Sequence, residues 1–214
     1  MNVELIAHHG DDLLVVNAAR VSFAKESNEF NGKDAKLINY LAREKHVLPF
    51  RHPQITVRCK APIFIARQLG KHQVGLSWSE ESRRYIDSEP EFFWPDKWRK
   101  RAENVKQGSS GEEVTKISNG ANLDKFMRTM VDNCMIAYKE ALSSSVAPEL
   151  ARMILPQNMY VNWVWTGSLL SFYQMYKLRS ESHAQVEAQH FANQLKAVVS
   201  PLYPISWEAL ETYA

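Results

Sequence analysis

The chain has 214 residues, of which 45% are hydrophobic, and a formal net charge of +2. This length fits one domain, or one domain with an elaboration, and the apolar fraction is ample for a packed core. The small charge, with both signs interspersed, argues against a nucleic-acid-binding protein. No apolar run approaches the roughly 20 residues that span a bilayer, and the first residues lack the basic start and apolar core of a signal peptide.

The two cysteines, Cys59 and Cys134, lie far apart, and neither has a second Cys or a His at metal-ligand spacing. This usage is typical of reduced core thiols in a cytosolic protein, so that neither a disulfide nor a metal site is indicated. We therefore expect a cytoplasmic protein without a bound metal.

The N-terminal segment predicts one strand and two helices. Residues 3–7 alternate weakly between apolar and polar, which indicates a short strand, and Asp11 and Asp12 can cap the helix that follows. Residues 26–33 are polar and are predicted to form a loop. Asp34 can then cap a second helix, whose apolar residues recur at helical spacing.

A stiff loop and a half-buried strand come next. Residues 46–53 contain two prolines, which exclude regular structure and present His52 from a rigid loop. A single histidine in a loop is more often structural or solvated than functional. Apolar and polar residues alternate over residues 55–59, as they do in a strand with one buried face.

Residues 61–85 begin as an apolar helix and become dense in groups that bind anions. Pro62 suits the first turn of that helix, which we expect to continue to about Gly75. Two pairs of polar side chains would lie four residues apart on the helix: Arg67 with Lys71, and Gln68 with His72. The polar run that follows completes an inventory of cations, hydroxyls and a carboxylate, which suits a phosphorylated ligand. A solvated loop after a surface helix fits the same composition.

The middle of the chain predicts an excursion and a long helix. The aromatic residues over 92–98 favour packing rather than a stacking platform for a ligand. Residues 97–120 are charged and then rich in Gly and Ser, and we predict a mobile excursion there rather than a linker between domains. A helix over residues 123–142 and a short helix that carries Arg152 follow, before a buried strand over residues 159–165.

The last third of the chain is predicted to be helical. One helix spans about residues 168–177, and a second opens at Ser182, which has capping-box spacing to Gln185. Arg179 and His183 flank this junction. They stand at the N-terminal end of the second helix, where backbone N–H groups also favour an anion.

Six sequence blocks, in the right order, resemble the flavin-dependent thymidylate synthases and cover nearly the whole chain. They are Ala18-Ala-Arg-Val-Ser-Phe23, Pro49-Phe-x-His52, Lys60-Ala-Pro-Ile-Phe-Ile-Ala-Arg-Gln68, Glu80-x-Ser-x-Arg-Tyr85, Ala151-Arg-x-x-Leu-Pro156 and Leu178-Arg-x-x-Ser-His-Ala-Gln185. With the predicted elements, the resemblance implies an α+β fold, in which a central, mostly antiparallel sheet is flanked by helices and a long helical part ends the chain. It also implies a single domain over residues 1–214.

The resemblance implies a methyltransferase that converts dUMP to dTMP by reductive methylation. Methylenetetrahydrofolate would give the carbon, FAD would carry the hydride, and NADPH would be the reductant. This family does not attack the pyrimidine with a cysteine, which suits a chain whose two cysteines lack a site-like context. The family typically forms a closed homotetramer, in which several subunits build each active site.

The resemblance also assigns roles to individual side chains. Arg84, with the backbone around Ser82, would bind the phosphate, because a guanidinium fits two oxygens at once. Arg179 would sit at the pyrimidine edge and stabilise negative charge as the ring is activated. No adjacent base is evident for Ser82, so we interpret it as a ligand-binding hydroxyl rather than a nucleophile.

The complete assignment has three sets of residues. The expected catalytic residues are Glu80, Ser82 and Arg179. The expected contacts to dUMP are Gln68, Glu80, Ser82, Arg84, Arg152 and Arg179. The expected contacts to FAD are His52, Lys71, His72, Gln73, Gln174 and His183.

The chain departs from the family pattern where the flavin is expected. The family has Arg-His-Arg where this chain has Lys71-His72-Gln73, and one extra residue precedes Ser79. The family also places Asn and Arg where Ser168 and Leu170 stand. Losing two cations, at Gln73 and Leu170, should weaken the hold on the FAD pyrophosphate.

Two alternatives therefore stay open. The first is a relative that transfers a one-carbon unit without full reduction and hydroxymethylates dUMP or dCMP. The second is a nucleotide-binding protein without turnover. The retention of four polar residues together argues against the second alternative: Glu80, Arg84, Arg152 and Arg179.

Overall fold

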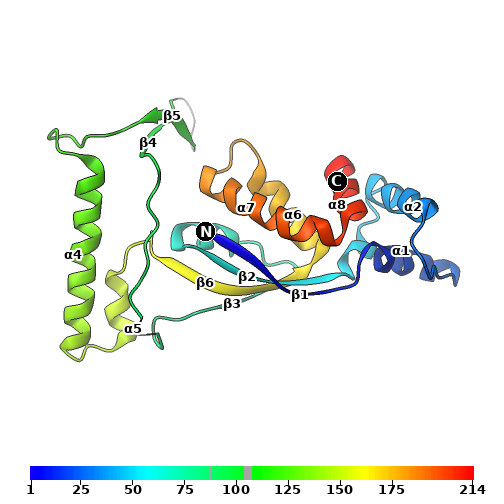
Figure 1. The fold of residues 1–214 in the computed structure, drawn as a ribbon, viewed down its shortest axis with the longest axis horizontal. Coiled ribbons are helices and arrows are strands. Elements are labelled where there is room, and N and C mark those ends of the chain that lie inside the picture. The colour runs from blue at the N-terminus through cyan, green and yellow to red at the C-terminus, as the bar shows by residue number, and fades with distance from the viewer. Residues whose placement is uncertain (87, 104–107) are drawn as a thin grey trace. The chain divides into compact units, whose positions relative to one another are not determined.

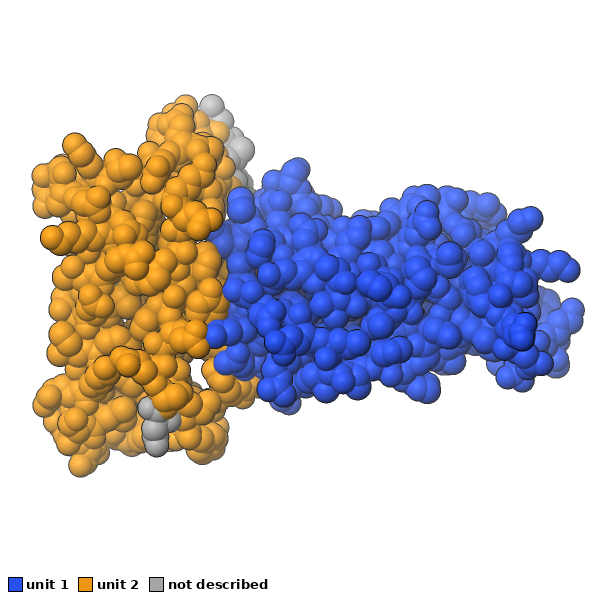
Figure 2. Space-filling model, viewed as in Figure 1, with its two compact units in different colours: residues 1–61, 67–79, 162–214 blue, residues 62–66, 80–161 orange. Residues whose placement is uncertain are grey.

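The structure is a computed structural model that describes residues 1–86, 88–103 and 108–214 (Figure 1). Its contacts divide the chain into two compact units, which Figure 2 colours separately. Unit 1 comprises residues 1–61, 67–79 and 162–214, and unit 2 comprises residues 62–66 and 80–161. The expectation of one domain over residues 1–214 stays a prediction.

Most of the elements predicted from the sequence are present in the structure. In chain order, with η for a short 3-10 helix, they are β1 (Asn2–His9), α1 (Asp12–Arg20), η1 (Val21–Phe23), α2 (Gly32–Arg43), η2 (Leu48–Arg51), β2 (Gln54–Pro62), α3 (Ile63–Leu69), β3 (Leu76–Glu80), β4 (Arg99–Arg101), β5 (Ser109–Glu113), α4 (Leu123–Ser143), α5 (Pro148–Ala151), η3 (Arg152–Ile154), β6 (Tyr160–Ser168), α6 (Leu169–Ser180), α7 (Val186–Val199), η4 (Ser200–Leu202) and α8 (Pro204–Tyr213). Among the described residues, no helix is both long and apolar enough to cross a membrane.

A four-stranded sheet with the order β1-β2-β6-β3 forms the centre of unit 1. Strands β1 and β2 run antiparallel, with Asn2 opposite Lys60 and His9 opposite Gln54. The alternation predicted for residues 55–59 is confirmed, because every second side chain of β2 is buried. Alternation in β6 buries Trp163 and Trp165 in the same way.

Helices α6 and α7 lie along the sheet of unit 1 (Figure 1), and α7 packs on β1. Aromatic side chains join the helices to β6: Trp163 stacks on Phe191 of α7 with ring centroids 5.7 Å apart, and Trp165 meets Phe172 of α6 edge-on at 5.4 Å. Burial of such large side chains is the main source of stabilisation in a core. The predicted α+β fold, with an antiparallel sheet flanked by helices and a long helical C-terminal part, is confirmed.

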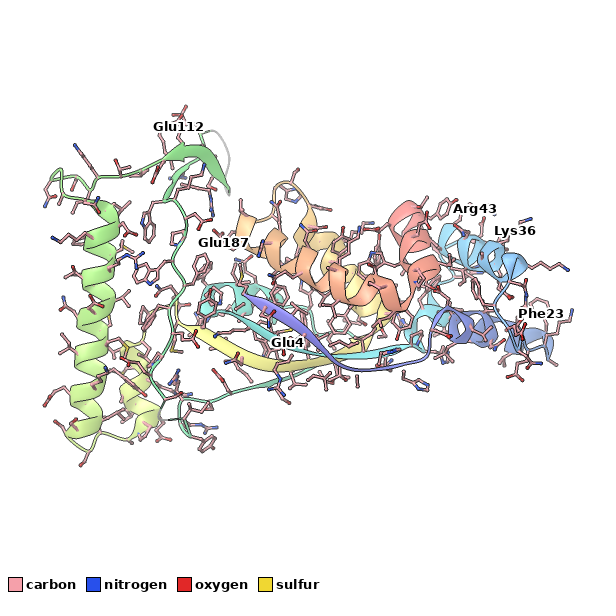
Figure 3. The ribbon with its side chains drawn as sticks, in the orientation of Figure 1. Glu4, Phe23, Lys36, Arg43, Glu112 and Glu187 are labelled. Carbon is pink, nitrogen blue, oxygen red and sulfur yellow. The ribbon has the colours of Figure 1, made fainter. Side chains whose placement is uncertain are left out.

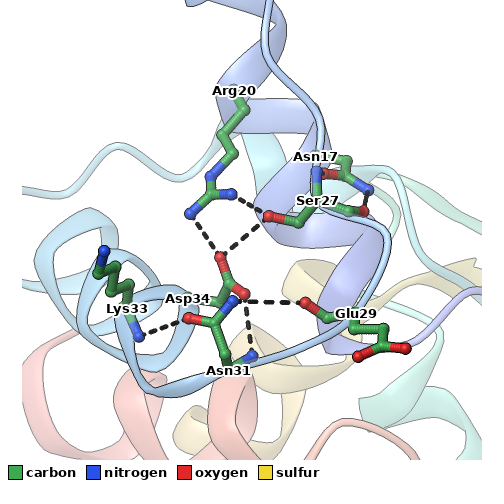
Figure 4. A network of polar contacts seen from close by, with 7 residues as sticks. All are labelled: Asn17, Arg20, Ser27, Glu29, Asn31, Lys33 and Asp34. Carbon is green, nitrogen blue, oxygen red and sulfur yellow. Dashed lines mark hydrogen bonds and ion pairs between the residues drawn. The ribbon is translucent and has the colours of Figure 1, made fainter.

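Arg20, from the first of the six sequence blocks, has a structural role in unit 1 (Figure 4). Its guanidinium lies 2.5 Å from a carboxylate oxygen of Asp34, whose side chain is fully buried. The structure corrects the predicted cap, because Asn31 is the N-cap of α2 and Asp34 completes the capping box from the third helical position. Ser27 donates to the same carboxylate at 3.3 Å. The network ties α1 to α2, and a buried charge of this kind is tolerated because it is paired and hydrogen-bonded.

Unit 2 contains the hairpin of β4 and β5, the long helix α4, and the short turns α5 and η3. The described residues of the predicted excursion over 97–120 include this hairpin, whereas residues 104–107 lie outside the described residues. The mobility of this segment stays a prediction. The aromatic residues pack as predicted: Phe93 meets Phe64 at 5.7 Å, and the guanidinium of Arg128 lies over the ring of Trp94 at 4.3 Å.

Candidate active site

The helix that opens the predicted anion-binding stretch ends earlier than expected. Helix α3 stops at Leu69, and the polar run predicted as a loop begins with strand β3 at Leu76. Between them, Gly75 has a φ of +69°, in the left-handed region that favours glycine. A Cβ at Gly75 would lie 2.4 Å from the hydroxyl oxygen of Ser171, so that only glycine fits here. The turn therefore carries the chain closely past the start of α6. Lys71 and His72 lie beyond the end of α3, so the predicted helical pairings of Arg67 with Lys71 and of Gln68 with His72 are wrong.

Arg179 nevertheless meets both Gln68 and His72. It lies near the C-terminal end of α6 and is half-buried. Its Nη2 donates to the backbone oxygen of Gln68 at 2.9 Å, and its Nε donates to Nε2 of His72 at 3.0 Å. The guanidinium is therefore fixed at two points by groups from the α3 end and the turn after it.

Both acceptors of Arg179 are uncharged. A guanidinium has no acceptor atoms, so that Nε2 of His72 must be unprotonated to receive the hydrogen bond. Burial, and then the positive charge of Arg179, lower the pKa of His72, which favours this neutral form. Burial also lowers the pKa of Arg179, whose ordinary value is so high that the group stays charged. These two contacts hold a cation without neutralising it.

Two further residues complete this group, and sequence reasoning did not assign them to the site. Gln185 was predicted to form a capping box with Ser182, but α7 begins at Val186, and no side chain caps its N-terminus. The side-chain oxygen of Gln185 accepts from Nε2 of Gln68 at 2.6 Å, and its Nε2 donates to Glu187 at 2.9 Å. Glu187 is buried. The signal in the sequence was a carboxylate two residues beyond the last of the six blocks. We call Gln68, His72, Arg179, Gln185 and Glu187 the Arg179 cluster; all five belong to unit 1.

Ser82, Arg84 and Arg152 form a second group, the Ser82 cluster, in unit 2. The backbone N–H and the Nε of Arg84 donate to the hydroxyl oxygen of Ser82 at 3.3 and 3.4 Å, and Nη1 of Arg152 reaches the same oxygen at 3.5 Å. Both arginines are exposed. Two guanidinium groups that converge on one hydroxyl repel each other, and an anion between them relieves this repulsion. Glu80 is exposed at the end of β3.

Five of the six expected dUMP contacts thus belong to two groups, one in each unit, and the sixth is Glu80 at the end of β3. Of the expected FAD contacts, His72 belongs to the Arg179 cluster, and the other five are polar side chains elsewhere in unit 1. His52 follows η2, Gln174 lies on α6, and His183 pairs with Glu181 at 3.0 Å. Lys71 and Gln73 lie in the turn before β3. All five are exposed, whereas His72 is half-buried against Arg179.

Two of the positions that depart from the pattern of the resembling family, Ser168 and Leu170, have structural roles here. Ser168 is 4% exposed and caps α6, because its hydroxyl accepts from the backbone N–H of Ser171 at 3.2 Å. Leu170 is 3% exposed and belongs to the hydrophobic core. Neither side chain offers a polar group to a ligand at the surface of unit 1.

Comparison with known proteins gives a consistent family. The chain matches the family described as thymidylate synthase complementing protein over residues 4–205. A flavin-dependent thymidylate synthase of Thermus thermophilus is 36% identical, in an alignment that covers 99% of this chain and 76% of that protein. The protein of the same name from Thermosipho africanus is also 36% identical, with 99% and 91% covered.

A solved structure is similar as well. The UMP/dUMP methylase PolB from Streptomyces cacaoi, bound with 5-Br dUMP, superposes with a TM-score of 0.84 at 29% identity, and the match covers 99% of this chain and 95% of that one. PolB bound with 5-Br UMP gives a TM-score of 0.81 at 29% identity, with 99% and 94% covered. The family match and the relatives span the same six blocks. This chain therefore belongs to the flavin-dependent thymidylate synthases, a family of methyltransferases.

Proposed function

We propose that this protein converts dUMP to dTMP by reductive methylation, with methylenetetrahydrofolate as carbon donor, FAD as hydride carrier and NADPH as reductant. The observation that carries the proposal is Arg179, whose guanidinium is held by two uncharged acceptors. A fixed cation of this kind can stabilise negative charge that develops on a substrate, because no reorganisation is needed when the charge appears. An activated pyrimidine ring is such a substrate.

The Ser82 cluster supports the nucleotide part of the proposal. Arg84 and Arg152 would bind the phosphate from two sides, with the hydroxyl of Ser82 between them. The similarity to PolB, which was solved with 5-Br dUMP, supports a nucleotide monophosphate as ligand. Gln68 and Glu80 would be further polar contacts to the nucleotide.

A cysteine nucleophile is not needed for this route. Cys59 is fully buried, and this burial raises the pKa of its thiol. A thiol with a raised pKa is a poor nucleophile, because the thiolate is the reactive form. Cys59 thus belongs to the core, as expected from the sequence.

The residues of unit 1 fit a flavin cofactor. His52, Lys71, Gln73, Gln174 and His183 each present an exposed polar group, and Lys71 adds a cation for a pyrophosphate. When bound, FAD would supply the hydride that completes the methyl group. Ser168 and Leu170 are buried, so that the hold on the cofactor would depend on the exposed set.

The proposal includes a cytoplasmic homotetramer with shared active sites. Five of the six expected dUMP contacts form two groups in the chain, and in such an assembly each site can draw on groups from different subunits.

The test is a complete reaction with dUMP, methylenetetrahydrofolate, FAD and NADPH, followed by mass analysis of the nucleotide. We expect a methyl group on the product and release of tritium from C5 of labelled dUMP. A hydroxymethyl group would overturn the proposal in favour of the hydroxymethylase alternative. Retention of all tritium would identify a binding protein without turnover.

UMP is a second candidate substrate, because the similar protein PolB is a UMP/dUMP methylase that was also solved with 5-Br UMP. The two candidates differ by the ribose 2′-hydroxyl, and kcat/KM for UMP and dUMP measured on one enzyme preparation separates them. We expect the higher value for dUMP, and a higher value for UMP would replace dUMP as the substrate.

A further inference from the structure

Glu187 is a buried carboxylate to which the family resemblance gives no role. It lies in the first turn of α7, where the helix N-terminus favours negative charge, and is labelled in Figure 3. Gln185 links it to Gln68 through two hydrogen bonds of 2.9 and 2.6 Å. Glu187, Gln185 and Gln68 are thus connected in series by hydrogen bonds, and Gln68 is a residue that we expect to bind dUMP.

The hydrogen bonds between these side chains run in one direction in the structure: Gln68 donates to Gln185, and Gln185 donates to Glu187. An ionised carboxylate accepts hydrogen bonds and cannot donate them, so that Gln185 must turn its NH₂ group toward Glu187. The side-chain oxygen of Gln185 then faces Gln68. Gln68 must in turn donate with its own NH₂ group. A carboxylate at position 187 thereby determines which end of the Gln68 amide points toward Gln185.

We propose that Glu187 is a positioning residue that fixes the amide of Gln68 for nucleotide binding, acting through Gln185. The inference rests on the proposed function, because it takes Gln68 as a contact to dUMP. The backbone oxygen of Gln68 is held at the same time by Arg179. Residues on either side of the α6–α7 connection therefore fix both the backbone and the side chain of Gln68.

The test exchanges Glu and Gln at positions 187 and 185, because the two side chains have nearly the same size. Glu187→Gln removes the fixed direction, because an amide at position 187 can either donate or accept. We expect dUMP to bind about tenfold more weakly, the effect of one lost hydrogen bond. We expect kcat to change much less than KM, since the contact is made before the transition state.

The double variant Glu187→Gln, Gln185→Glu distinguishes positioning from a structural role. Its new carboxylate at position 185 accepts from Gln68 on one side and from the new amide at position 187 on the other. The direction at Gln68 is thus restored, and dUMP affinity should return to within about twofold of the wild-type value. Glu208→Gln on α8 removes an exposed carboxylate and serves as the control, with unchanged affinity.

A second readout does not need the nucleotide. In protein labelled with ¹⁵N-glutamine, the side-chain NH₂ signals of Gln68 should shift in Glu187→Gln and return in the double variant. The proposed role of Glu187 would be overturned by unchanged Gln68 signals in Glu187→Gln. It would also be overturned if the double variant did not restore dUMP affinity. If the wild-type protein does not bind dUMP while the Gln68 signals behave as expected, the proposed function fails, but the orientation of the Gln68 amide by Glu187 is still supported.

Discussion

The Arg179 cluster and the Ser82 cluster hold their arginines in different ways. Arg179 is half-buried and is fixed by acceptors on a neighbouring element. Arg84 and Arg152 are exposed and share one hydroxyl, at distances near the limit for a hydrogen bond. A cation fixed in a partly dry environment suits the stabilisation of charge during a reaction, whereas exposed cations suit the capture of a phosphate. The comparison therefore predicts an effect on kcat from the loss of Arg179, and effects on KM from the loss of either arginine of the Ser82 cluster.

The largest effect is expected at Arg179. Arg179→Ala should lower kcat by about 10²–10³-fold, because a fixed cation that stabilises developing charge is lost. The thermal midpoint should stay close to the wild-type value, since the side chain is only half-buried. Arg43→Ala, which removes an exposed arginine of α2, is the control. Wild-type turnover in the Arg179 variant would contradict the assigned role.

The next effect concerns the helix that carries Arg179. Leu170 is 3% exposed in the first turn of α6, so that Leu170→Arg places an unpaired cation in the core. We expect a loss of about 3 kcal/mol or more in the free energy of unfolding, rather than tighter FAD binding. Urea unfolding measures the loss. Leu178→Arg, at a 49% exposed position of the same helix, should cost little. A stable Leu170→Arg protein with tighter FAD binding would show that this position faces the cofactor.

Sequence reasoning predicted the frame of this molecule better than its turns. The strand at residues 55–59, the helix at 123–142 and the strand at 159–165 follow from local alternation or periodicity, and all three are present. The end of α3 at Leu69 was missed, although Gly70 follows it directly and glycine is common just past the end of a helix. The turn after it, by contrast, depends on a distant contact, namely the approach of Gly75 to Ser171. A local pattern carries no information about that approach.

The site shows the same division. The family resemblance assigned Gln68, His72 and Arg179 to the site, and these three residues do meet in unit 1. It also named Arg84 and Arg152, which converge on Ser82. Gln185 was predicted to cap α7 with its side chain, but this side chain contacts Gln68, which lies 117 positions away in the chain. A contact between residues so far apart in the sequence can be identified only from the folded structure.

Smaller effects are expected at the Ser82 cluster. Arg84→Ala and Arg152→Ala should each raise the KM for dUMP by about 10–100-fold, since each removes a hydrogen bond between charged groups. Neither should lower kcat as much as Arg179→Ala does. Arg101→Ala on β4 is the control within unit 2. Binding of deoxyuridine, which lacks the phosphate, should not respond to either variant, and an equal loss for nucleoside and nucleotide would place both arginines away from the phosphate.

The smallest effect is a dependence of stability on pH through His72. Burial and the charge of Arg179 lower the pKa of His72 in the folded state below its ordinary value of 6.5. The unfolded chain therefore binds this proton more readily, and stability present above about pH 6.5 is lost as the pH falls through the folded pKa. The slope stays below the one-proton limit of about 1.4 kcal/mol per pH unit, because solvent screens a half-buried group.

Urea unfolding of the wild type and of His72→Gln between about pH 5 and 7.5 isolates this contribution. Glutamine keeps an acceptor for Arg179 but does not titrate, so that the variant should lose less stability on acidification than the wild type. His190→Gln, at an exposed position of α7, should follow the wild-type curve. Identical curves for all three proteins would mean that His72 is not held neutral by Arg179. The contact with His72, which helps to fix Arg179 but has no counterpart in the Ser82 cluster as described, would then be lost as an explanation of the different roles of the two clusters.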